Sequence, residues 1–308
     1  MTDSKNYRLG TVPVDGGDLA VGAWGHQDAP VVLAVHGVTA SHRCWPLVAG
    51  HLPGLRIIAP DLRGRGRSNA LRGPFGMAQH ADDLARVLDG FGVDRALVVG
   101  HSMGAFASVV LAHRHPSRVS GLVLVDGGLP LTVPEGTSSE DFTRAVLGPA
   151  AERLSMTFSS RQEYARFWKV HPAFVHDWND TVAGYIDYDL TGGEGHWHAA
   201  TAYQAVAEDS AELSGSDTVI QALHSLAHPT TFLRAERGLQ NEPRALYSPE
   251  DVARWHRRVP SLTVRNVDGV NHYTIVMSDR GAAAVATAVR DTAQLARDID
   301  HDTHKELT

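Results

Sequence analysis

The chain contains a single cysteine, Cys44, among its 308 residues. An intrachain disulfide is therefore excluded. Positive charge is also scarce, because 28 lysines and arginines face 35 aspartates and glutamates and leave a net charge of −7 at pH 7. This balance gives no general attraction to nucleic acid, so we expect no nucleic-acid partner.

Long apolar stretches are absent as well. No apolar run reaches the roughly 20 residues that a membrane span requires, so we expect no membrane association. The first residues, Met1 to Arg8, lack the apolar core of a signal peptide. We therefore expect a cytoplasmic protein. With 43% apolar and 20% charged residues, the composition is that of an ordinary globular protein, large enough for one α/β domain or a core with an inserted cap.

Short apolar runs alternate with helical patterns through most of the chain. A continuous apolar run is typical of a strand buried on both faces of a parallel sheet, whereas the turn at Asp15-Gly16-Gly17 predicts an antiparallel hairpin near the amino end. Strands are predicted at residues 7–14, 19–24, 31–37, 56–59, 95–100, 119–126, 230–235 and 262–267. Helices are predicted at residues 46–52, 77–90, 103–115, 249–257 and 280–298, followed by a frayed tail from His301 to Thr308.

One stretch carries a chemical signature. Gly100-His-Ser-Met-Gly104 matches the pattern G-x-S-x-G and lies between a predicted strand and a predicted helix. The two glycines allow neighbouring backbone to pass close to a sharp turn, and the helix directs its first N–H groups toward the place where oxyanion charge would develop. The pattern predicts that Ser102 is a catalytic nucleophile; the alternative is a merely structural turn between strand and helix.

This stretch and its surroundings resemble the α/β-hydrolase fold family. Asp61-Leu-Arg63-Gly64-Arg-Gly66-Arg-Ser68 is similar to the family's D-x-R-G-x-G-x-S loop. The resemblance implies an α/β-hydrolase fold, with a mostly parallel eight-stranded sheet flanked by helices and a helical cap inserted in it. It divides the chain into a first core part at residues 1–128, a cap or lid at 129–228 and a second core part at 229–308. Within the cap, helices are predicted at residues 140–147, 162–170, 199–208 and 218–226, and no strand stands out.

A serine hydroxyl needs a base that accepts its proton. His272 follows the last predicted strand, where the resemblance places the family's histidine, and we expect it to act as general base and then as general acid. The acid that orients His272 stays open. We expect Glu236 first, at the position where the family often has an aspartate; the alternatives are Asp126, at the end of an earlier strand, and Glu242. Asp268 is too close to His272 in the sequence to turn its carboxylate onto the ring.

The oxyanion formed during acyl transfer needs two backbone N–H donors. The resemblance implies that they belong to Met103, which follows the nucleophile, and to Val38, which follows His36-Gly37. His36 is expected to brace this loop rather than react, and His101 to pack or to form a wall of the substrate pocket.

The sequence offers no convincing metal or cofactor site. His196-x-His198 lacks a third ligand at recognisable spacing, so we expect no metal, and the expected chemistry needs no cofactor. Most aromatic and histidine residues of the predicted cap are expected to pack rather than to line a pocket.

These predictions together indicate a serine hydrolase acting on a small or aromatic carboxylic monoester, its small-molecule partner. A serine at residue 102, where haloalkane dehalogenases and epoxide hydrolases have aspartate, argues against those two branches. Acyltransferase, lactonase, amidase, perhydrolase and carbon–carbon bond hydrolase activities stay open on the same scaffold, as does a ligand-binding receptor. The sequence leaves monomer and homodimer open.

Overall fold

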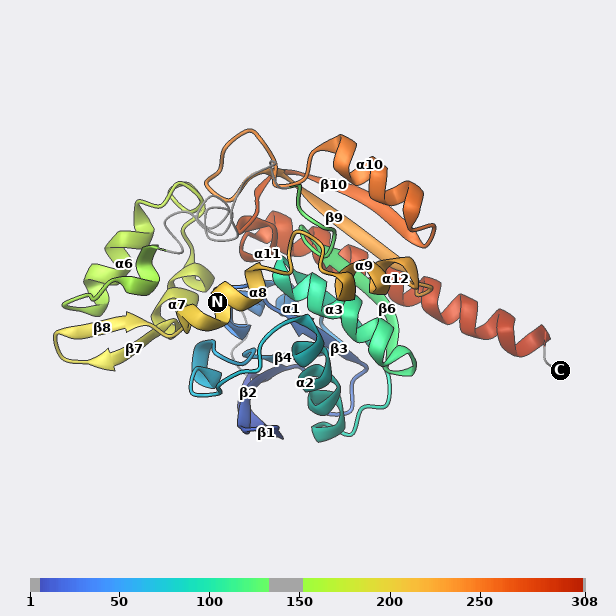
Figure 1. Ribbon diagram of the computed structural model, residues 1–308, viewed down its shortest axis with the longest axis horizontal. Helices are drawn as coiled ribbons and strands as arrows, with labels where there is room; N and C mark the ends of the chain where they lie inside the picture. The colour runs from blue at the N-terminus through green and yellow to red at the C-terminus, as the bar shows by residue number, and fades with distance from the viewer. Residues whose placement is uncertain (1–5, 133–151, 307–308) are drawn as a thin grey trace.

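The computed structural model describes residues 6–132 and 152–306. One eight-stranded sheet, in the order β1-β2-β4-β3-β5-β6-β9-β10, forms its centre (Figure 1). The β1–β2 and β2–β4 pairs are antiparallel and the remaining pairs are parallel. The strands are β1 (Arg8–Val14), β2 (Gly17–Trp24), β3 (Val31–Val35), β4 (Arg56–Pro60), β5 (Ala96–His101), β6 (Val119–Val125), β9 (Thr230–Arg237) and β10 (Leu262–Asn271). The predicted fold class, including the amino-terminal hairpin, is confirmed.

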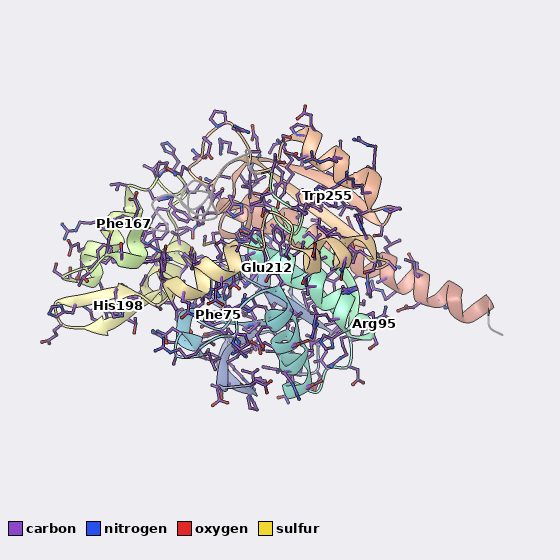
Figure 2. All side chains as sticks on the ribbon, in the orientation of Figure 1. Phe75, Arg95, Phe167, His198, Glu212 and Trp255 are labelled. Atoms are coloured by element: carbon purple, nitrogen blue, oxygen red, sulfur yellow. The ribbon has the colours of Figure 1, made fainter. Side chains whose placement is uncertain are left out.

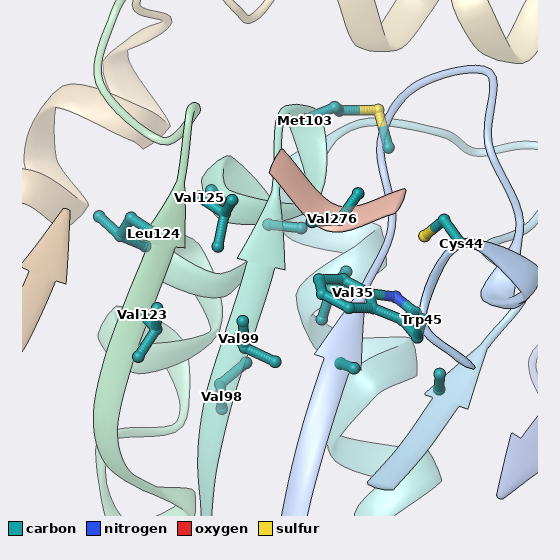
Figure 3. Close-up of a cluster of buried hydrophobic side chains, with 14 of the residues drawn as sticks. Val35, Cys44, Trp45, Val98, Val99, Met103, Val123, Leu124, Val125 and Val276 are labelled. Carbon is teal, nitrogen blue, oxygen red and sulfur yellow. The ribbon is translucent and has the colours of Figure 1, made fainter. Parts of the chain in front are cut away.

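The apolar runs of the sequence form the middle of this sheet. Apart from Val31 at the start of β3, the valines and leucines of β3, β5 and β6 are almost completely buried, and their side chains pack on both faces of the strands (Figure 3). Burial on both faces explains why these strands read as continuous apolar runs rather than as alternating ones. The carboxyl ends of these parallel strands meet at one edge of the sheet, and the loops that follow them therefore lie together.

Helices cover both faces of the sheet. The core helices are α1 (Pro46–Gly50), α2 (Met77–Gly90), α3 (Met103–Arg114), α10 (Pro249–Arg258), α11 (Thr274–Met277) and α12 (Asp279–Glu306). Both α3 and α12 contact β5 and β6, and the two helices lie on opposite sides of the sheet (Figure 1). The tail that was predicted to fray from His301 instead continues α12 as far as Glu306.

The described residues between β6 and β9 form a mixed segment. It contains α6 (Arg161–Lys169), α7 (Asp180–Tyr188), β7 (Leu190–Gly193), β8 (His196–Ala199), α8 (Tyr203–Ser210) and α9 (Asp217–His224). Helices α6, α8 and α9 were predicted, whereas the antiparallel β7–β8 hairpin contradicts the expectation of a segment without strands. The helix predicted at residues 140–147 lies outside the described residues.

This segment extends to one side of the sheet. Figure 2 shows Phe167 on α6 and His198 on the hairpin near its outer end. Helix α9, by contrast, packs against α3. Among the described residues, no helix is both long and apolar enough to cross a membrane.

Candidate active site

Ser102 lies in the sharp turn between β5 and α3. Its backbone has φ 54° and ψ −126°, a conformation that L residues rarely adopt. The flanking glycines make this turn possible: a Cβ at Gly100 would approach the Ala105 Cα to 2.5 Å, and one at Gly104 would approach the Val35 carbonyl oxygen to 2.2 Å. The G-x-S-x-G pattern is therefore required by close backbone contacts, and it presents the Ser102 side chain at the carboxyl edge of the sheet.

His272 is paired with Asp126 across this edge. The distance between His272 Nδ1 and Asp126 Oδ2 is 2.7 Å, and both side chains are buried. Asp126 directly follows β6 with φ 46°, and its other carboxylate oxygen accepts a hydrogen bond from the Ala235 amide at 3.1 Å. A carboxylate only accepts hydrogen bonds, so Nδ1 of His272 carries the proton and Nε2 is left as the basic nitrogen.

The other candidate carboxylates lie elsewhere. Glu236, the first choice from the sequence, accepts a hydrogen bond from the Gly269 amide. Glu242 accepts one from the Gln240 amide at 2.7 Å, within its own loop. Asp268 is exposed. The structure therefore places the alternative, Asp126, against His272. Asp126 follows the end of β6, which is the neighbour of β9 in the sheet, whereas Glu236 still lies within strand β9.

Ser102 and His272 line the same two small cavities. One has a volume of about 30 Å³ and the other of about 10 Å³. Both cavities share Val38 and Leu239, but their other walls differ. The larger is lined further by Gly37, Thr39, Ala40, Cys44, His101, Tyr185, Tyr273 and Met277. The smaller is lined further by Phe106, Asp126, Gly127, Leu131, Leu213, Leu246 and Tyr247. Mainly apolar walls thus surround the serine and the histidine.

The loop after β3 is held by His36. The Leu62 amide donates to His36 Nε2 at 2.9 Å, so Nδ1 carries the proton and donates to the Gly37 carbonyl oxygen at 2.8 Å. Burial lowers the pKa of His36 to about 4, which keeps the ring neutral near pH 7. The bonded carbonyl belongs to the same peptide unit as the Val38 N–H. Because a trans peptide points its C=O and N–H in opposite directions, His36 fixes the direction of the Val38 donor.

Two buried arginines hold the next two carbonyls of this loop. Arg65 Nε donates to the Val38 oxygen at 2.9 Å, and Arg153 Nη2 donates to the Thr39 oxygen at 3.0 Å. Each guanidinium is paired with an aspartate of the β6–β9 segment, Arg65 with Asp209 at 2.6 Å and Arg153 with Asp189 at 3.0 Å. The sequence leaves open whether the arginines of the Asp61–Ser68 loop, Arg65 among them, anchor that loop or lie in solvent. Nothing in the local pattern around Arg153 distinguishes it from a solvated arginine.

His196 and His198, which we did not expect to bind a metal, lie on the β7–β8 hairpin. Across residues 6–132 and 152–306, the structure contains no group of three or more histidine, cysteine, aspartate or glutamate side chains arranged to hold a metal ion.

Comparison with known proteins agrees with the fold. Residues 30–160 match the family model described as the alpha/beta hydrolase fold. The solved structure of E-2-(acetamidomethylene)succinate hydrolase superposes with a TM-score of 0.76 at 22% identity, covering 92% of this chain and 99% of that one. A thioesterase domain from the curacin biosynthetic pathway superposes with a TM-score of 0.72 at 21% identity and the same coverage. The chain has the α/β-hydrolase fold.

Sequence relatives of this α/β-hydrolase fold protein include several named hydrolases. Lipase LipV of Mycobacterium tuberculosis is 38% identical over 130 residues, which are 42% of this chain and 48% of the lipase. The bifunctional esterase/perhydrolase DCH of Acinetobacter calcoaceticus is 31% identical over 49% of this chain and 54% of its own. Epoxide hydrolase B of M. tuberculosis is 29% identical over 52% of this chain and 46% of its own. The chain thus spans about half the length of the curated relatives it matches.

Proposed function

We propose that this protein is a serine hydrolase that cleaves a small carboxylic ester through an acyl-enzyme on Ser102. The observation that carries the proposal is the buried 2.7 Å pair of His272 and Asp126, whose imidazole lines the same cavities as the Ser102 side chain. This arrangement has the elements of a nucleophile, a base and an orienting acid.

The proposed reaction uses this chain's own groups at each step. Ser102 Oγ attacks the ester carbonyl while His272 Nε2 takes its proton, and the Asp126 carboxylate stabilises the imidazolium. The N–H groups of Val38 and Met103 donate to the oxyanion. The intermediate collapses as His272 returns the proton to the leaving alcohol. Water, deprotonated by His272, then attacks the acyl-enzyme, releases the acid and regenerates Ser102.

The narrow site supports a small substrate. The larger cavity beside Ser102, of about 30 Å³, holds one or two water molecules, so we expect the acyl part that lies there to be short while the rest of the ester extends beyond it. Two relatives carry the names lipase and esterase/perhydrolase, which supports an ester rather than another acyl compound. The relative named epoxide hydrolase does not alter the proposal, because Ser102 provides a hydroxyl nucleophile.

Replacing the nucleophile tests the proposal. For Ser102→Ala we expect hydrolysis of 4-nitrophenyl acetate to fall by at least about 10³-fold, because the proposed mechanism has no other nucleophile. Thermal unfolding should show that the fold is retained. Ser225→Ala, which removes a hydroxyl at the end of α9 bonded to His113, is the matched control and should keep the native rate. Near-native activity of Ser102→Ala would refute the assignment.

A further inference from the structure

His101 lies beside the nucleophile but has no role in the proposed proton transfers. It is the last residue of β5, its side chain is only 4% exposed, and it lines the larger cavity together with Ser102. Its ring packs against that of His272, with 4.8 Å between the ring centroids.

The hydrogen bond of His101 determines its tautomer. Its Nε2 lies 2.8 Å from the backbone carbonyl oxygen of His272. A carbonyl oxygen only accepts, so Nε2 carries the proton. Burial, together with the neighbouring His272 ring, holds the pKa of His101 well below its usual value, which keeps the ring neutral. The second nitrogen, Nδ1, is consequently a hydrogen-bond acceptor.

This acceptor is buried and unpaired. Within the part of the chain that the structure describes, His101 Nδ1 has no hydrogen-bond partner. An ideal Cβ placed on Gly37 would lie 3.6 Å from His101 Nδ1 and 3.6 Å from Ser102 Oγ, so both atoms border the space that Gly37 leaves open. An unpaired buried acceptor is costly, and such a group next to a reactive serine indicates that a bound molecule supplies the donor.

We propose that His101 is a specificity-determining residue whose Nδ1 accepts a hydrogen bond from an O–H or N–H group of the substrate. The substrate class is then an ester that carries a hydroxyl or amide N–H donor a few bonds from the scissile carbonyl. This inference rests on the ester hydrolysis proposed above. An ester without the donor leaves Nδ1 unpaired once water has been displaced, and it therefore reacts more slowly.

Two matched pairs of esters test the inference. Methyl lactate and methyl propanoate differ by a donor on the acyl side, and 2-hydroxyethyl acetate and propyl acetate by a donor on the alcohol side. The value of kcat/KM is measured for all four by pH-stat titration with the native protein and with His101→Phe, which keeps a ring but removes both nitrogens. For at least one pair, we expect the ratio of donor to non-donor ester to fall about tenfold in the variant, the usual scale of one hydrogen bond.

The ratio separates recognition from a general effect on the site. A disturbance of His272 lowers kcat/KM for both esters of a pair, so it does not change their ratio. The intrinsic reactivities of the two esters are the same for the native protein and the variant, so they do not affect the comparison of the two ratios. His101→Leu replaces His101→Phe if thermal unfolding shows that phenylalanine does not fit. Ratios that stay within twofold of native for both pairs overturn the inference but leave ester hydrolysis intact. Failure of the native protein to hydrolyse any of the four esters overturns the proposed function, and this inference with it.

Discussion

Three buried histidine–aspartate pairs occur among the described residues, at His42–Asp61, His80–Asp209 and His272–Asp126, and only the last lines a cavity together with Ser102. His42 Nδ1 lies 2.8 Å from Asp61 Oδ1, and the phenol of Tyr7 lies 2.7 Å from its Nε2. Both nitrogens of His42 are thus engaged by the fold. His272 has the same contact with Asp126 through Nδ1, but among the described residues its Nε2 makes no hydrogen bond. The cavities that His272 shares with Ser102, rather than the pair itself, distinguish the proposed base from a structural histidine.

The identity of the acid can be tested by two isosteric changes. Asp126→Asn should lower kcat for 4-nitrophenyl acetate by about 10³- to 10⁴-fold, because an amide facing Nδ1 favours the wrong tautomer of His272. Glu236→Gln should stay within about threefold of native, because its carboxylate bonds the Gly269 amide instead. Steady-state kinetics on both folded variants decides between them. A large loss in Glu236→Gln with little change in Asp126→Asn would contradict the assignment.

At this scale, local pattern predicted some site residues and not others. Ser102 and the Val38 and Met103 amides follow from short motifs, and His272 from its place after the last strand. The contact between Asp126 and His272 joins residues 146 positions apart and depends on strand order and on the positive φ of Asp126. A single sequence shows neither of these directly.

At the scale of elements, helix α8 is tied to the loop after β3. Asp209 on α8 accepts from Arg65, whose Nε holds the Val38 carbonyl, and it also contacts His80 Nε2 at 2.9 Å. Burial alone would raise the pKa of Asp209, but the charges of His80 and Arg65 outweigh burial and hold this pKa below its usual value. A carboxyl with a lowered folded-state pKa stabilises the fold above its unfolded pKa of about 4 and loses that contribution as the pH falls.

Removing this charge has a defined consequence for stability. Asp209→Asn leaves the buried Arg65 guanidinium without its counter-ion, and we expect the free energy of unfolding to fall by about 3–5 kcal/mol at pH 7. The difference from native should shrink as the pH drops below 4. Asp82→Asn is the matched control: its partner Arg114 is 42% exposed, so the change should be at most about 1 kcal/mol. Urea unfolding at several pH values measures both, and equal losses in the two variants would contradict a special role for Asp209.

At the scale of the whole molecule, the sheet was predictable because its central strands are continuous apolar runs between turn signals. The β7–β8 hairpin was not, since its strands have four residues each and Leu190-Thr-Gly-Gly193 offers glycine in place of alternating apolar residues. Helix α7 was missed as well, although Asn179 caps it by accepting from the Thr181 and Val182 amides. In the β6–β9 segment, local pattern thus predicted helices α6, α8 and α9 but neither α7 nor the hairpin.

The central claim is that Ser102 is the nucleophile of an ester hydrolase, and covalent capture tests it most directly. The native protein is treated with diethyl 4-nitrophenyl phosphate, an activated ester that phosphorylates nucleophilic serines, and the modified peptide is identified by mass spectrometry while residual hydrolysis of 4-nitrophenyl acetate is measured. The account predicts one diethylphosphoryl group per chain, attached to Ser102, with activity lost in proportion to the modification. Full modification of Ser102 with activity retained, or loss of activity through an adduct on another residue, would contradict it.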